Sequence, residues 1–250
     1  MSNKNNIIDL KRLRTSCMQC HARQVCLAAG LSEAEMRALD QIVERRQVLE
    51  QGEQIFHQGQ TLSHLHVVRS GAVKTFSLDT NGEEQISGFH LPGEFLGLDA
   101  IAGERHVCTA QALESSSVCD IPFAGFEALA RVVPGLQLHL LRRMSREIHR
   151  NEQAMVLLGK TTAKQRLAAY LFDVSCDYRK QGLSPNTFRL SMTRCDIANY
   201  LGLAPETVSR LMTCLQREGV ITLTGREVTI NNVAALQYPR HRDRYRIAGM

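Results

Sequence analysis

The stretch TRCDIANYLGLAPETVSRLMTCLQR, residues 193–217, decides the fold of this chain. Its first residues predict a helix N-terminus, because Thr193 can cap the helix while Asp196, three residues on, completes a capping box. The Leu-Gly-Leu that follows permits a tight turn. Pro205 suits the first turn of a second helix, which we expect over 206–217. The stretch therefore predicts two short helices joined by a turn.

An alternating stretch follows, VITLTGREVTI (220–230), and it predicts a β-hairpin. We assign residues 161–236 to a winged helix-turn-helix domain. In the second helix Glu206, Ser209 and Arg210 share one face. Arg is suited to bidentate contact with guanine, Glu can accept a hydrogen bond from the cytosine N4 amino group, and Ser can donate or accept a hydrogen bond. An exposed Glu206–Arg210 salt bridge is the competing interpretation, but the capped helix and the hairpin favour DNA docking.

Residues 136–160 predict one long helix upstream of this domain. Apolar positions recur every three or four residues in a narrow stripe, as expected of a dimerising seam. A helix packed on its own domain is the alternative. Asn151 is the one polar residue of the stripe. The predicted dimerisation residues are Leu140, Met144, Ile148, Asn151, Met155 and Leu158.

Residues 30–135 predict a β-rich domain. An amphipathic helix over 31–46 opens it, with Ser32 as a candidate N-cap. Short segments of strand composition follow, such as 65–69 and 73–77, separated by glycines. Many short strands at near-regular spacing indicate a barrel or roll.

Three thiols, Cys17, Cys20 and Cys26, lie close together ahead of this domain. Such a run can converge on one soft metal centre. An iron–sulfur cluster normally takes four thiolates, so a fourth ligand must come from elsewhere. A zinc site with His21 or a distant residue as fourth ligand, a redox dithiol and chance are alternatives that the spacing leaves open.

The net charge of +5 is unevenly distributed along the 250 residues. Acidic residues outnumber basic ones over 1–136, and basic residues outnumber acidic ones over 137–250, a range that includes the basic tail 237–250. This asymmetry favours a C-terminal module that binds a polyanion. No apolar stretch is long enough to span a membrane, and no export signal accompanies the eight cysteines. We therefore expect a cytoplasmic protein with reduced thiols. No catalytic triad, phosphate loop or paired acid–base group stands out, which disfavours an enzyme.

Residues 193–217 closely resemble the winged helix of the cAMP receptor/FNR superfamily of transcription regulators, and the E-x-x-S-R pattern is similar to the FNR branch. GEEQISGFHLPGE (82–94), AQALE (110–114) and VCDIP (118–122) resemble FNR-type sensory domains, and RMSREI (143–148) their dimerisation helix. The resemblance implies an α+β fold: an N-terminal β-roll (a cupin-like jelly roll) sensory domain, a long dimerisation helix and a C-terminal winged helix-turn-helix.

The resemblance also implies a cofactor. FNR proteins hold an oxygen-labile [4Fe–4S] cluster on a Cys-x2-Cys-x5-Cys run and one cysteine of the roll. The matching ligands here are Cys17, Cys20 and Cys26, in a cluster-binding segment 1–29, and Cys119. Cys108 is a second candidate for the fourth ligand, but it lacks the family context.

The function implied is that of an oxygen-responsive regulator that activates transcription of anaerobic genes. It would bind palindromic TTGAT-like sites as a homodimer when its cluster is intact, and contact RNA polymerase through the loop Leu78–Glu83. A related DNA-binding regulator with a zinc or thiol redox site is the alternative.

Two departures from the superfamily matter. Where cyclic-nucleotide-binding relatives have Glu for the ribose and Arg-Ser for the phosphate, this chain has Gly97-Leu98-Asp99 and His106-Val107, which disfavours cyclic nucleotide. Asn151 stands where FNR-type proteins commonly carry an acidic residue. Its lack of charge predicts either weaker oxygen control of dimerisation or control through other contacts.

Overall fold

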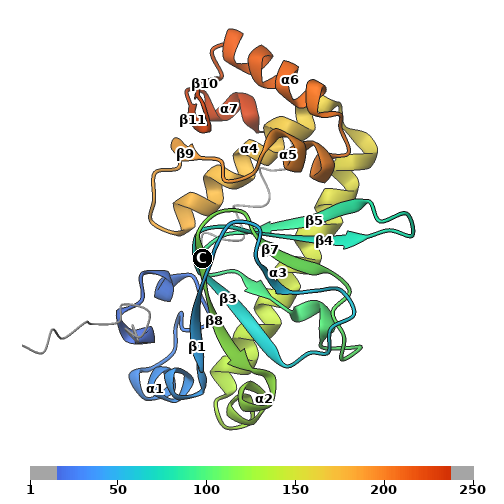
Figure 1. Cartoon of the computed structure of the whole chain (residues 1–250). Helices are drawn as coiled ribbons and strands as arrows, with labels where there is room; N and C mark the ends of the chain where they lie inside the picture. Colours follow the sequence, from blue (N-terminus) through green and yellow to red (C-terminus); the bar gives the residue numbers. More distant parts are fainter. Residues whose placement is uncertain (1–15, 238–250) are drawn as a thin grey trace, which may run out of the picture.

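The computed structural model describes residues 16–237, which form a β-roll, a long central helix and a DNA-binding domain (Figure 1). The N-terminal part consists of two short 3₁₀ helices, η2 (Cys17–Gln19) and η3 (His21–Gln24), followed by α1 (Glu33–Ile42). Ser32 and Glu35 form a full capping box at α1, as Ser32 predicts. The helix is shorter than the expected 31–46, because the chain from Arg45 onward pairs with a strand of the roll.

The roll consists of two four-stranded antiparallel sheets. The first has the order β1-β8-β3-β6, with the bounds Arg45–Leu49, Ser116–Pro122, His64–Ser70 and Phe95–Leu96. The second has the order β2-β7-β4-β5, with the bounds Gln54–Phe56, Thr109–Ala112, Val73–Leu78 and Glu84–His90. A 3₁₀ turn, η4 (Leu98–Ala100), follows β6. The many short strands confirm the expected roll, and β5 is an outer strand of its sheet.

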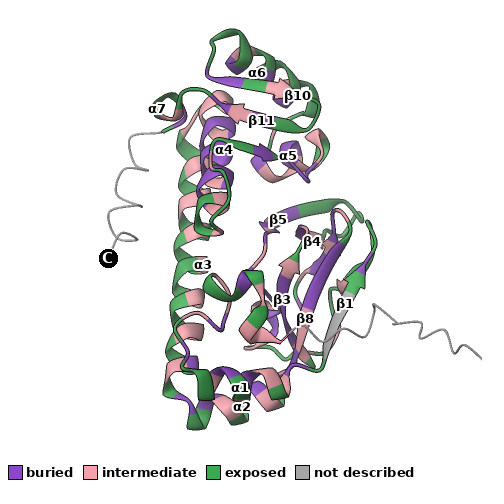
Figure 2. Ribbon diagram, turned by 90° about the vertical axis from the view of Figure 1, so that its left-hand side faces the viewer, coloured by how far each residue is buried: buried purple, intermediate pink, exposed green. Residues whose placement is uncertain are grey.

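Two helices, α2 (Phe123–Val132) and α3 (Pro134–Lys160), lead from the roll to the DNA-binding domain, which begins with α4 (Ala163–Lys180). Pro134 starts α3, where its missing N–H costs no helical hydrogen bond. Figure 2 shows α3 running beside both the roll and the DNA-binding domain. Within residues 16–237, none of the helices combines the length and apolar character that crossing a bilayer requires.

The C-terminal part contains the predicted helix-turn-helix and hairpin. Its elements are β9 (Thr187–Arg189), α5 (Arg194–Leu201), α6 (Pro205–Arg217), β10 (Ile221–Thr224), β11 (Glu227–Ile230) and α7 (Val233–Leu236). Thr193 and Asp196 form the predicted capping box. Gly202 ends α5 at a φ of +61°, a left-handed conformation that glycine adopts without strain.

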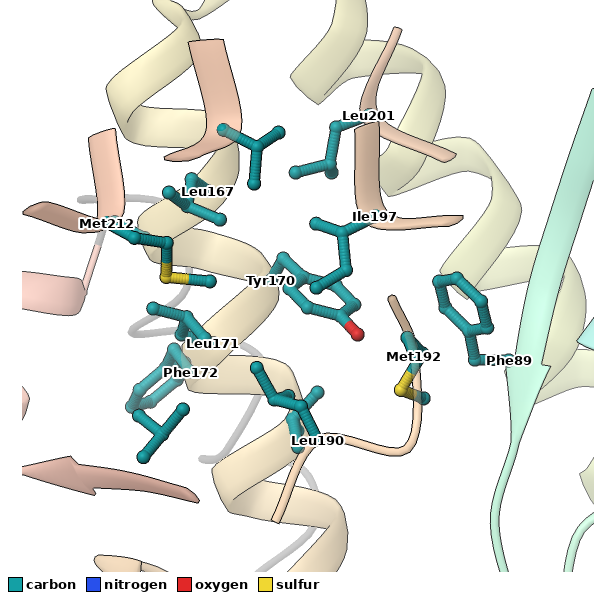
Figure 3. Packing of buried hydrophobic residues seen from close by; sticks show 14 of the residues in the cluster. Phe89, Leu167, Tyr170, Leu171, Phe172, Leu190, Met192, Ile197, Leu201 and Met212 are labelled. Carbon is teal, nitrogen blue, oxygen red and sulfur yellow. The ribbon is translucent and has the colours of Figure 1, made fainter. Parts of the chain in front are cut away.

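One apolar core joins the DNA-binding domain to the roll. Buried residues of α4, α5 and α6 pack together with Phe76, Ile86 and Phe89 of the second sheet. Figure 3 shows Phe89 facing the group around Tyr170 and Met192. A separate core lies under the cysteine segment and includes Leu27, α1, the first sheet and the beginning of α3. The two parts of the chain that carry predicted function are therefore both packed against the roll.

Candidate metal centre and nucleic-acid interface

The four predicted cluster ligands line one cavity. Cys17, Cys20 and Cys26 reach it from the N-terminal segment and Cys119 from β8. Apolar side chains form most of the remaining wall, among them Ala22, Leu27, Leu39, Val43, Val67 and Ile121, and Arg69 also lines it. The alternative ligand His21 is exposed and Cys108 lies elsewhere in the roll, so neither contributes to this wall.

The cavity is small, about 30 Å³, which is room for about two water molecules. Within residues 16–237, no three His, Cys, Asp or Glu side chains are gathered closely enough to hold a metal ion directly. The thiols therefore share a chamber without forming a closed ligand shell. As a donor set they fit a soft metal: four thiolates suit an iron–sulfur cluster and also a Cys₄ zinc site.

Local hydrogen bonds order the cysteine segment and attach it to α1. The Cys17 amide donates to Asp40 Oδ1 of α1 at 2.9 Å, and the Cys26 sulfur accepts from the Ala28 amide at 3.4 Å. On β8, Cys119 and Ile121 are two residues apart, so both side chains point to the cavity side of the strand. These contacts add to the two short 3₁₀ helices of the segment, η2 and η3.

The electrostatic environments of the cysteines differ. Burial raises the pKa of Cys26, while the Ala28 amide and the Arg143 guanidinium on α3 act in the opposite direction and favour the thiolate. Burial and the nearby Asp99 carboxylate raise the pKa of Cys108 to about 12. Its thiol donates to Asp99 Oδ2 at 3.5 Å. Because metals bind thiolates, this environment disfavours Cys108 as a ligand.

Two glycines bring the cysteine segment against the rest of the molecule. A β-carbon on Gly93, in the turn after β5, would lie 2.6 Å from Val25 Cγ2 and 2.9 Å from the Val25 carbonyl oxygen. A β-carbon on Gly30 would lie 3.2 Å from Nε2 of His139 on α3. Both glycines have positive φ values. The segment that carries three of the thiols is thus in close contact with the roll and with α3.

Helix α6 presents the three predicted DNA-contacting residues to solvent. Glu206, Ser209 and Arg210 are exposed, while the opposite face of the helix is buried in the core. Arg210 donates from Nε to the Glu206 backbone carbonyl and from Nη2 to the Thr207 hydroxyl, both at 3.4 Å. The Arg210 side chain thus bonds to the Glu206 backbone and to Thr207, whereas the competing interpretation predicts a salt bridge to the Glu206 carboxylate. The predicted DNA-contacting face of α6, which we call the reading face, is therefore exposed to solvent.

Helix α3 exposes an apolar stripe that only partly matches the predicted seam. Ile148 and Met155 are 59% and 68% exposed, and Asn151 and Leu158 are exposed with them. Met144 is half-buried, and Leu140 packs against the core under the cysteine segment. The sequence pattern missed Leu141, which is 60% exposed seven residues before Ile148. A spacing of seven from 141 to 148 to 155 would have indicated it.

Comparison with known proteins identifies the family to which the chain belongs. Residues 46–132 match the family model of the cyclic nucleotide-binding domain, and residues 165–238 match the Crp-like helix-turn-helix domain. The chain is 49% identical over 214 residues to the transcriptional activator protein Anr of Pseudomonas protegens, covering 86% of this chain and 88% of that one. It is 42% identical over 220 residues to the fumarate and nitrate reduction regulatory protein of Shigella dysenteriae, covering 88% of each. The chain belongs to the Crp/FNR family, in its FNR branch.

Among solved structures, this Crp/FNR chain is similar to FixK2 from Bradyrhizobium japonicum. The TM-score is 0.71 and the identity 30%, over 76% of this chain and 94% of that one. Membership of the family confirms the expected α+β fold with its roll, long helix and winged helix-turn-helix. It also makes the protein a transcription regulator and not an enzyme, as the lack of a catalytic constellation in the sequence suggested.

Proposed function

We propose that this Crp/FNR protein is an oxygen-responsive activator of anaerobic genes that carries a [4Fe–4S] cluster on Cys17, Cys20, Cys26 and Cys119. The observation that carries the proposal is the shared cavity: two distant parts of the chain bring all four thiols to one apolar chamber. The relationship to FNR-branch regulators favours iron–sulfur over the alternative of zinc or a redox thiol pair.

Four thiolates on one centre would crosslink the cysteine segment to β8, and oxygen would release that crosslink. The segment packs on α3 through Gly30 and His139, and Arg143 of α3 lies near Cys26. Fixing the segment would therefore fix the start of α3 and favour the dimer, since two states that stabilise each other are thermodynamically linked. The exposed stripe around Ile148 and Met155 is the surface that a second copy would cover.

In the dimer, two copies of α6 would read the two halves of a palindromic TTGAT-like site through Glu206, Ser209 and Arg210. We further propose that RNA polymerase contacts the exposed hairpin tip at 78–83, between β4 and β5. Such a regulator would act in the cytoplasm.

We also propose that the roll holds no cyclic nucleotide. Asp99 accepts from the Val107 amide at 2.8 Å and lies 3.3 Å from the His106 ring, so a carboxylate occupies the region where a phosphate would bind. The Phe56 and His106 rings stack with centroids 3.8 Å apart and fill the adjacent interior. A second anion beside Asp99 would be repelled.

The decisive experiment is analysis of protein purified without oxygen. We expect a brown protein with about four iron and four sulfide per chain. After exposure to air it should lose its colour and bind a TTGAT palindrome more weakly. Titration with cAMP should release no heat. A colourless protein with one zinc per chain and air-insensitive DNA binding would instead establish the alternative.

A further inference from the structure

The first helix of the helix-turn-helix is bound to the outer strand of the roll. The Asn199 amide donates from Nδ2 to the Glu84 carbonyl at 2.6 Å, and its Oδ1 accepts from the Ile86 amide at 2.7 Å. One side chain on α5 thus bonds to backbone groups of β5 much as a neighbouring strand would. We call this contact, with the ion pair described next, the α5–β5 contact.

An ion pair reinforces it. The Lys74 ammonium, on β4, lies 2.7 Å from Glu84 Oε2 and 3.5 Å from Asp196 Oδ1. The Lys74 side chain is only 10% exposed and that of Asp196 14%. Asp196 also accepts from the Thr193 amide in the capping box of α5. The N-terminus of α5 is therefore held by a largely buried charge from the roll, and removal of Lys74 leaves the Asp196 carboxylate largely buried without that cation.

The α5–β5 contact is a second attachment of the DNA-binding domain. Its covalent attachment to α3 is short, since α3 ends at Lys160 and α4 begins at Ala163. The apolar core that Phe76, Ile86 and Phe89 share with α4, α5 and α6 also holds the domain against the roll, but apolar packing is non-directional and leaves some freedom of rotation about the linker. The α5–β5 contact adds directional bonds that fix the orientation of the domain on the roll, and the roll is itself bonded to α3 through Glu94 and Arg150. Figure 2 shows α5 between β5 and α6, so the contact holds the domain from the side away from the exposed reading face of α6.

We infer that Asn199 and Lys74 are positioning residues that determine which spacing between two DNA half-sites the protein accepts. The inference rests on the proposed function, in which two copies pair through α3 and each reads one half-site. A dimer places its two reading helices at a fixed separation, about 34 Å for half-sites one helical turn apart. The α5–β5 contact sets that separation, because it fixes α6 relative to the helix that carries the seam. The affinity of one α6 for one half-site does not depend on it.

The test uses full-length anaerobic protein and a series of duplexes. Each duplex carries two half-sites whose spacing differs from the optimum by up to two base pairs in either direction, and a further duplex carries one half-site. We expect the wild type to prefer one spacing by about tenfold or more. Asn199→Ala should bind the optimal palindrome about tenfold more weakly, lose most of the spacing preference, and bind the single half-site with unchanged affinity.

Lys74→Met should behave in the same way, and Lys74→Arg, which keeps the charge, should retain the wild-type preference. Gln85→Ala is the matched control, because Gln85 lies on β5 between the two residues bound by Asn199, and its exposed side chain donates to the Ile86 carbonyl of its own strand. Urea unfolding and sedimentation establish that the variants are folded and dimeric.

Two results would overturn the inference: a wild-type spacing preference retained in Asn199→Ala, or equal losses on the palindrome and on the single half-site. A wild type that binds a palindrome no better than a half-site would contradict the proposed dimeric function itself.

Discussion

Arg150 of α3 donates a hydrogen bond to Glu94 of the roll, with 3.0 Å between Nη1 and Oε1. Both side chains are about three-quarters buried, and the second Arg150 amino group donates to the Phe89 carbonyl. Glu94 directly follows Gly93, the residue in contact with Val25 of the cysteine segment. One turn of the roll thus contacts both the cysteine segment and the central helix.

Breaking this pair should destabilise the protein. Glu94→Ala leaves the Arg150 charge largely buried without its partner, and we expect a loss of about 2 kcal/mol in the free energy of unfolding. Urea unfolding of the cluster-free protein measures it. The exposed pair Arg131–Glu127 is the control, and Glu127→Ala should cost less than about 0.5 kcal/mol. Equal effects of the two substitutions would contradict the role given to Glu94.

His90 makes the fold sensitive to acid. Burial lowers the pKa of its imidazole from 6.5 to about 4, and the ring lies 3.0 Å from the Thr75 hydroxyl. Between these pH values the unfolded chain binds a proton that the folded protein does not. The free energy of unfolding therefore falls as the pH drops from about 6.5 to about 4, by up to about 3 kcal/mol. Chemical unfolding of wild type and His90→Gln at pH 7 and pH 5 should show a smaller fall in the variant.

The ligand assignment predicts a contrast between two cysteines of the roll. Cys119→Ser should abolish the visible absorbance and most of the bound iron, because four thiolates are required. Cys108→Ser should retain both, since the Cys108 thiol is held protonated beside Asp99. Absorbance and iron analysis of anaerobic preparations decide the matter. The reverse pattern would exchange the roles of the two residues.

Arg210 should contribute to sequence reading more than to general affinity. Loss of a bidentate base contact costs about 1–3 kcal/mol. The dimer would lose one contact in each half-site, so Arg210→Ala should weaken binding to a TTGAT palindrome by about 30-fold or more. At the same salt concentration, binding to unrelated DNA should change by less than about threefold. Equal losses on both duplexes would identify Arg210 as a phosphate contact.

The charge of the side chain at position 151 should affect how tightly the cluster-free protein dimerises. It is exposed on α3 near Ile148 and Met155, where two copies would face each other. Two carboxylates there would repel, so Asn151→Asp should weaken dimerisation of the cluster-free protein by about fivefold. Sedimentation across a concentration series measures this, with the uncharged Asn151→Gln as control. Identical dissociation constants for wild type and Asn151→Asp would show that the side chain lies outside the interface.

The sequence allowed prediction of features that depend on residues close together in the chain. The capping box of Thr193 and Asp196, the turn at Gly202 and the cysteine run follow from local spacing. The partnership of Cys119 with that run came from a family resemblance, because nothing near Cys119 indicates it. The shift of the exposed stripe from Leu140 to Leu141 depends on how α3 packs against the cysteine segment.

The contacts between the domains could not be predicted from the sequence, because they join residues that are far apart in the chain. Lys74 and Asp196 are 122 positions apart, and Asn199 and Ile86 are 113 apart. Lys74, Asp196 and Asn199 are residue types that are common on exposed surfaces, so none of them alone indicates a contact between domains. Arg150 likewise falls outside the apolar stripe of α3, and only the folded chain brings it to Glu94.

The bonds from Asn199 to β5 have a consequence for solubility. An outer strand with unpaired backbone groups is a template on which a strand of another molecule can add, and this is a common route to aggregation. On β5 the amide of Ile86 and the carbonyl of Glu84 are already bound within the same chain. Whenever the DNA-binding domain moves away, that edge becomes available to other molecules, so a regulator that lost this attachment would be at risk of precipitating in the cell.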